Sequence, residues 1–275
     1  MPVSDSSTWR RIPAEIWVLG FVSLLMDIAS EMVHSLLPVF LVSVIGTSVW
    51  VAVVPGFLAA ALLVLGVREP ASSGTAKRTN PITKQNLKRL HAPYWWVVGI
   101  GAVFTLARFS EAFLVLRAQQ GGLALAYAPL VLVAMNVVYA AFAYPLGKLS
   151  DSASHTKLLA WSLVILIAAD AMLAWSNDWA WVWGGISLWG LHMAMSQGLL
   201  ASMVAGAVPS ELRGTAYGFF NLASGAAMLL ASVIAGLLWD QFGATFTFVV
   251  GGAFASMSLI LILVYGRVRH AMRTA

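Results

Sequence analysis

The chain has 275 residues, of which 60% are hydrophobic and only 10% are charged. An average soluble domain carries roughly a quarter charged residues, so a soluble fold could not cover this much apolar surface. The net charge of +5 does not indicate nucleic-acid binding, because the basic residues lie between hydrophobic runs rather than on one soluble face.

The hydrophobic runs predict an all-α polytopic membrane protein. A bilayer core of about 30 Å requires about 20 helical residues. On that rule the chain contains eight candidate transmembrane helices, near 16–45, 50–67, 95–117, 124–146, 158–176, 179–207, 214–238 and 245–265. The first run follows Arg10 and Arg11 as a signal peptide would, but it is far longer than a signal h-region. We therefore interpret it as a retained span.

A polar, basic segment separates the second run from the third. Residues 68–93 contain serine, glycine, proline and several lysines and arginines, which is typical of a cytoplasmic linker. This divides the chain into a two-helix part (1–67), the linker (68–93) and a six-helix part (94–275).

The distribution of basic residues predicts the orientation, because positively charged loops stay in the cytoplasm. With the N-terminus inside, only Arg117 faces outside and Arg108 falls within a span. The other 14 of the 16 face inward: Arg10, Arg11, Arg68, Lys77, Arg78, Lys84, Lys88, Arg89, Lys148, Lys157, Arg213, Arg267, Arg269 and Arg273. We expect both termini in the cytoplasm.

Four stretches together resemble one family. They read GFVSLLMDIASEMVHSLLPVFL in the first helix, VPGFLAAALLVLGVREP before the linker, GKLSDSASHTK in a later loop, and VPSELRGTAYGFFNLASG near the seventh span. The chain resembles a bacterial permease of the major facilitator superfamily, which implies a location in the bacterial inner (cytoplasmic) membrane. This resemblance implies two six-helix halves joined by a cytoplasmic linker, a central cavity, and transport by alternating access.

The N-terminal part has fewer helices than the resemblance implies. Its two helices resemble the first and sixth helices of the family, so about four helices are missing around Gly46 to Val49. An even number of missing helices preserves the orientation on both sides. The six spans after the linker correspond to a complete C-terminal half.

The loop from Gly147 to Lys157 corresponds to a conformational loop of the family. Gly147 would permit a tight helix exit. Asp151 could accept hydrogen bonds from the start of a neighbouring helix and act as a latch. Ser152 replaces the family arginine, and Lys157 retains the later basic character. An ordinary polar turn is the alternative interpretation.

Ionisable residues inside the spans are the main functional candidates, because each is costly in hydrocarbon and usually faces a bundle interior or water. On the first helix, Asp27, Glu31 and His34 have the spacing of one helical face. On the third, Arg108 and Glu111 are three residues apart and share a face as well. We expect the two faces to meet, so that the surplus acids hold a proton and couple solute movement to proton movement, or balance a cationic solute. Salt bridges that only support packing are the alternative.

The remaining polar residues in the spans have weaker functional predictions. Asp170 is expected near the membrane interface, beside Asn177 and Asp178. Four residues could line a solute path, although bonds between helices are the commoner role: Asn136, His192, Gln197 and Asn221. His192 has no second histidine at metal-binding spacing, and the chain lacks cysteine, so we expect no metal and no cofactor.

Small residues recur every four positions on two spans, which predicts close helix packing. The sixth span carries Ala194, Gly198, Ser202 and Gly206, and the seventh carries Ala223, Ala227, Ala231 and Ala235.

Three functions can be compared with these features. The first is a secondary transporter of a small organic solute, possessing a proton-coupling site. The second is a membrane binding or structural protein from an internally shortened transporter gene, which inserts into the bilayer and could associate with further copies of itself. The third is a membrane enzyme. The sequence contains no known catalytic signature, so we do not expect the protein to be an enzyme.

Overall fold

The computed structural model describes residues 89–175 and 178–274. The first two predicted spans, the linker, the region of Gly46 to Val49 and the candidate residues Asp27, Glu31 and His34 therefore lie outside the described residues. The described elements are all helical: α4 (Ala92–Ala107), α5 (Ala112–Gln120), η2 (Leu125–Tyr127), α6 (Ala128–Ser152), α7 (His155–Trp175), α8 (Trp179–Ser196), α9 (Leu199–Ala207), η3 (Ser210–Leu212) and α10 (Arg213–Thr274).

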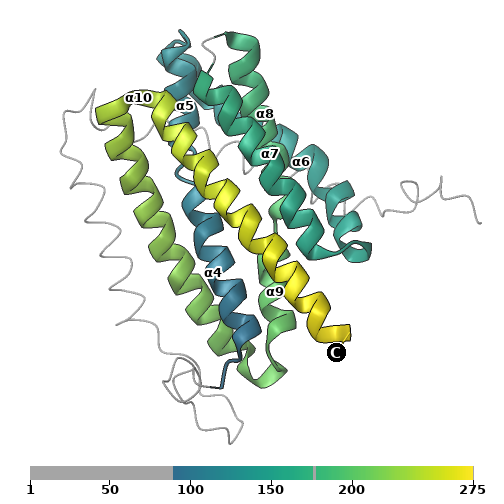
Figure 1. Ribbon diagram of the computed structural model, residues 1–275. Helices are drawn as coiled ribbons and strands as arrows, with labels where there is room; N and C mark the ends of the chain where they lie inside the picture. The colour runs from purple at the N-terminus through teal and green to yellow at the C-terminus, as the bar shows by residue number, and fades with distance from the viewer. Residues whose placement is uncertain (1–88, 176–177, 275) are drawn as a thin grey trace, which may run out of the picture.

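These helices form six passes that run alternately up and down (Figure 1). Helices α4 and α5 together make the first pass, and α8 and α9 together make the fourth. Helix α10 contains the last two passes, joined at Gly243. Within the described part of the chain, four stretches are long and apolar enough to cross a membrane: Ala92–Gln120, Leu125–Ser152, His155–Trp175 and Ser210–Arg267. The helical membrane fold predicted from the hydrophobic runs is confirmed.

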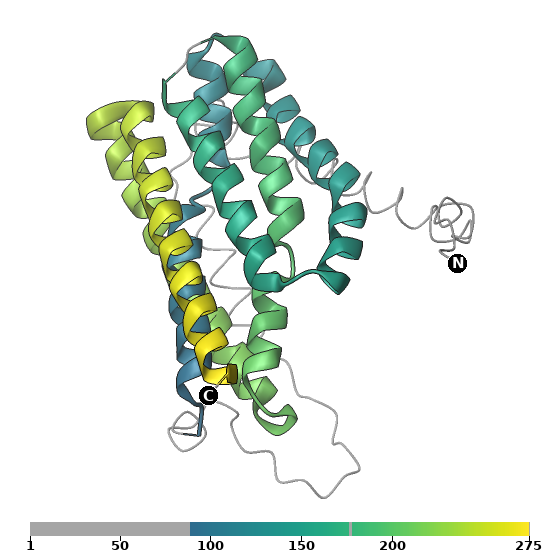
Figure 2. The same cartoon turned by 45° about the vertical axis from the view of Figure 1, so that its right-hand side comes forward.

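The core of the described bundle lies around α7. Leu159, Leu163 and Leu166 of this helix are completely buried. Helix α7 packs against α8 on one side and against α10 on the other, while α6 packs on α8 and α4 packs on α10. Figure 2 shows α7 and α8 side by side, with the last pass of α10 next to α7. This arrangement encloses the inner faces of α7 and α8.

The contact between α6 and α8 depends on a glycine. A Cβ atom at Gly190 of α8 would collide with the backbone carbonyl oxygen of Met135 in α6, and would also lie 3.3 Å from the Cβ atom of Val138. The two backbones can therefore approach this closely only because position 190 has no side chain.

The turn within α10 is made by a single glycine. Gly243 has φ 81° and ψ 179°, a region that is essentially restricted to glycine. The small residues Ala227, Ala231 and Ala235 before the turn are each at most 6% exposed. Ala231 and Ala235 line a narrow gap that Thr247 of the last pass also lines. The close packing expected for the seventh span is thus present.

Candidate functional site

The first described pass is interrupted at the two charged residues that the sequence singled out. Helix α4 ends at Ala107 and α5 begins at Ala112, so Arg108 and Glu111 lie at the break rather than on one continuous helix. The prediction that helical spacing places them on one face is therefore wrong. The backbone N–H of Ala112 donates to the hydroxyl of Ser110, 3.3 Å away, which stabilises the restart of the helix.

Arg108 faces a partly enclosed environment. Its side chain is half-buried, and its Nε atom is enclosed without a hydrogen-bond partner among the described residues. The guanidinium carbon lies 5.7 Å from the centre of the Phe104 ring, within the range of a cation–π interaction. Arg108 also interacts electrostatically with Glu111 and Tyr139. The break thus holds a cation whose Nε atom donates to none of the described residues.

His192 of α8 lies near Arg108. It is completely buried, and its Nδ1 atom is 2.7 Å from the carbonyl oxygen of Ser162. Because a carbonyl can only accept, Nδ1 carries the proton in this contact. The Nε2 atom has no hydrogen-bond partner among the described residues. The ring lies 5.5 Å from Phe104, which also contacts Arg108.

Asp170 of α7 is in the bundle interior, which corrects the prediction of an interfacial residue. Its side chain is 1% exposed. The indole Nε1 of Trp189 donates to its Oδ1 at 3.2 Å, whereas Oδ2 has no hydrogen-bond partner within the described chain. A Cβ atom at Gly251 would lie 3.1 Å from Oδ2 and 2.7 Å from the Phe109 ring. Because Gly251 has no side chain, there is room next to it for the carboxyl group of Asp170.

The enclosure of Asp170 is not evident from the sequence, because a residue near the end of a hydrophobic run usually lies at the membrane interface. The glycine pair at 251 and 252 on the last pass was the available signal, because glycines allow a buried polar group on a facing helix to approach the backbone.

Aromatic rings connect these polar groups. Trp189 contacts both Phe109 and His192, with ring centres 5.9 and 6.4 Å apart. Phe109 follows Arg108 directly and packs on Phe248 of the last pass at 5.5 Å. The break in the first pass, the buried histidine and the buried aspartate thus form one continuous region within the bundle.

The other predicted lining residues do not come together within the described part of the chain. Asn136 of α6 is half-buried, and its Nδ2 atom has no hydrogen-bond partner among the described residues. Gln197 is exposed and lies between α8 and α9, and Asn221 is exposed on α10. Their role in solute binding stays a prediction.

A second break interrupts the fourth pass. Helix α8 ends at Ser196 and α9 begins at Leu199, and Gly198 between them has φ 74°, which favours glycine. Gly198, Ser202 and Gly206 are exposed, and no atom of the described residues lies within 4 Å of a Cβ atom built on either glycine. Among the described residues no helix packs against these three positions, and Gly198 lies between two helices instead of inside one. The packing expected for this part of the stripe stays a prediction.

The predicted conformational loop also differs in its geometry. Helix α6 continues through Gly147 to Ser152, so Gly147 does not form a tight helix exit. Asp151 is exposed in the last turn of α6, and Lys157 is exposed in the first turn of α7. The latch function of this loop stays a prediction.

The described chain forms antiparallel apolar passes, two of which are interrupted, and the bundle encloses polar side chains. These features are typical of a polytopic membrane protein of the secondary-transporter type. The family model described as Major Facilitator Superfamily matches residues 16–223 and 112–274. The chain belongs to the major facilitator superfamily.

Two curated relatives were compared with this chain. An uncharacterized MFS-type transporter of Methanocaldococcus jannaschii is 29% identical over 220 residues, which cover 78% of this chain and 54% of the relative. A lysosomal dipeptide transporter of Bos taurus is 33% identical over 110 residues, which cover 40% of this chain and 23% of the relative. The chain thus matches about half of the first relative and about a quarter of the second.

Proposed function

We propose that this chain moves a small organic solute across a membrane by the alternating access typical of its family. The observation that carries the proposal is the break between α4 and α5, which places Arg108 and Glu111 within an apolar pass. Charged residues within membrane spans are costly and commonly mark solute or ion pathways. Family membership supports the same function.

The chemistry of the break favours a solute with a hydrogen-bond acceptor. An interrupted helix leaves backbone groups without helical partners, and transporters use such groups to bind substrates. The half-buried guanidinium of Arg108 adds charged donors at the same place. A carboxylate of the solute would match these donors in charge and geometry.

Proton coupling is the second part of the proposal. Asp27, Glu31 and His34 are proposed to provide titratable groups opposite Arg108 and Glu111. Burial of several acids near one arginine disfavours full ionisation, so a proton can be taken up and released during the cycle. We further propose a bacterial inner-membrane location with both termini in the cytoplasm, on the basis of the basic residues in the loops.

The solute is proposed only as a class. The name of the Bos taurus relative specifies dipeptides, but the match covers 23% of that protein. Dipeptides therefore belong in a test panel without being assigned as the substrate.

The test measures solute-driven proton movement. The full chain is reconstituted into liposomes loaded with a pH-sensitive dye, and dipeptides, amino acids, sugars and carboxylic acids are added in turn. We expect at least one class to change the internal pH, and we expect Arg108→Gln to abolish the change. Arg213→Gln is the matched control, because Arg213 is exposed at the start of α10. Equal activity of the Arg108→Gln variant and the unaltered protein would contradict the assigned role of the break.

A further inference from the structure

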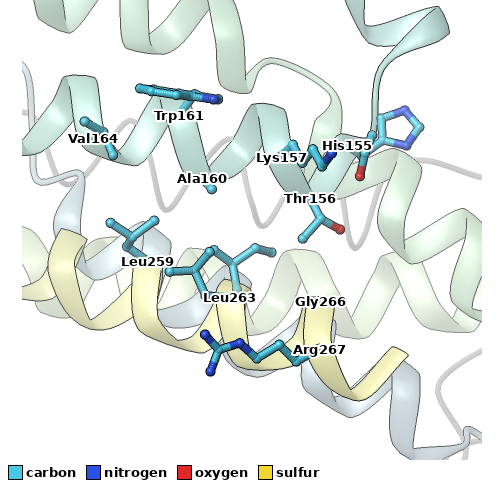
Figure 3. Close-up of a pocket in the computed structure, with 12 residues that line it drawn as sticks. His155, Thr156, Lys157, Ala160, Trp161, Val164, Leu259, Leu263, Gly266 and Arg267 are labelled. Atoms are coloured by element: carbon cyan, nitrogen blue, oxygen red, sulfur yellow. The ribbon is translucent and has the colours of Figure 1, made fainter. Parts of the chain in front are cut away.

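An open groove lies between the beginning of α7 and the end of α10, away from the polar region described above. It has a volume of about 920 Å³. Figure 3 shows Thr156 and Ala160 of α7 facing Leu263 and Gly266 of α10. A Cβ atom at Gly266 would lie 3.5 Å from Thr156 Cγ2, so the two helices are in close contact at this end.

The groove is polar at one end and apolar along the rest of its length. Ser154, His155, Thr156 and Lys157 line it from the first turn of α7, and Arg267 lines it from α10. Trp161, Val164 and Leu263 follow toward the middle of the spans and are 64%, 41% and 52% exposed. Lys157 and Val164 are seven residues apart, which corresponds to roughly 10 Å along the helix axis.

The polar end is suited to an anion. Lys157 and Arg267 are both exposed and both positively charged, and no residue among those described as lining the groove is acidic. The N-terminus of α7 lies at the same end, where the first backbone N–H groups of a helix lack intrahelical acceptors and carry partial positive charge. Phosphate groups bind well to such helix termini.

We propose that this groove binds an anionic phospholipid. The phosphate of the headgroup contacts Lys157, Arg267 and the start of α7, and one acyl chain lies along Ala160, Val164 and Leu263. The order of polar and apolar residues along the groove matches that of an amphiphile. A free phosphate would use only the polar end, and a zwitterionic lipid would bring the positive charge of its own headgroup close to Lys157 and Arg267. Basic pockets between membrane helices are known to select anionic headgroups.

The experiment counts lipids bound to the purified full chain by native mass spectrometry. Phosphatidylglycerol and phosphatidylcholine with identical acyl chains are added in equal amounts, and glycerol phosphate is tested separately. We expect at least one phosphatidylglycerol to remain bound in preference to phosphatidylcholine, and glycerol phosphate to bind far more weakly. The double variant Lys157→Gln with Arg267→Gln should weaken phosphatidylglycerol binding by about 20- to 30-fold, since each cation near the surface contributes about fivefold.

Two further variants separate specific binding from general attraction. Lys148→Gln with Arg213→Gln removes the same charge from exposed positions outside the groove and should leave binding unchanged. Gly266→Leu places an apolar side chain in the groove and should displace the lipid while all charges remain. Equal losses in the two double variants, or full lipid binding by Gly266→Leu, would overturn the proposal. Binding of glycerol phosphate as tightly as phosphatidylglycerol would also overturn it, as would a dimer of this chain that forms through the groove and excludes lipid.

Discussion

Replacing Gly190 with Ala tests the close contact between α6 and α8. The added Cβ atom would collide with the carbonyl oxygen of Met135, and would lie 3.2 Å from the carbon of that carbonyl. These are backbone atoms, so no side-chain rotation can relieve the collision, and the two helices must separate. Overpacking of this kind costs about 1–3 kcal/mol. One kcal/mol corresponds to about 2–4 °C for a chain of this size, so we expect the melting temperature to fall by about 2–12 °C.

The assay follows tryptophan fluorescence of the purified protein during heating in detergent. Gly236→Ala is the matched control, because no atom from residues 89–175 or 178–274 lies within 4 Å of a Cβ atom at that position in α10. Alanine is favoured over glycine in a helix by roughly 0.5–1 kcal/mol, so the control should be neutral or slightly stabilised. An unchanged melting temperature for Gly190→Ala, together with the same result for the control, would refute the close approach of α6 and α8.

Three further outcomes are expected. A fusion of alkaline phosphatase at Thr79 should be inactive and a fusion at Gly122 should be active, because the enzyme folds only outside the cytoplasm; activity at Thr79 would reverse the proposed orientation. Trp189→Phe should destabilise the protein by about 1–3 kcal/mol, because the buried carboxyl of Asp170 loses its donor. In an Asp170→Leu background the same change should cost much less, and equal costs in both backgrounds would argue against the pairing. Gly243→Ala should cost about 1–3 kcal/mol in thermal unfolding through backbone strain, since no atom in the described part of the chain lies within 4 Å of a Cβ atom there. Unaltered stability would show that the turn adopts another conformation.

The passes of the C-terminal part could be predicted because they depend on composition averaged over about 20 residues. Hydropathy does not, however, specify where a helix stops inside an apolar run. The break after Ala107 depends on local contacts, including the hydroxyl of Ser110, and the break at Gly198 depends on the conformation of one residue. Helical periodicity treats both passes as continuous helices, whereas Arg108 and Glu111 lie between the end of α4 and the start of α5.

The candidate site could be predicted only in part, because burial is a property of facing helices. Arg108 and His192 were found from their residue types within apolar runs. The environment of Asp170 is provided by Trp189, Phe109 and Gly251, which come from three other passes. A single run of sequence contains no information on which of its residues these partners will enclose. The helix exit expected at Gly147 has a different reason: glycine permits a tight exit but does not require one, and α6 continues beyond it to Ser152.

The one-residue turn at Gly243 also has a consequence for biosynthesis. Because almost no loop separates the last two passes, they can enter the bilayer together as a preformed hairpin. In the proposed orientation, the only charge that must cross the membrane near this turn is that of Asp240. The last two passes would then be anchored in a single insertion event, and in the proposed orientation the basic residues that follow them stay in the cytoplasm.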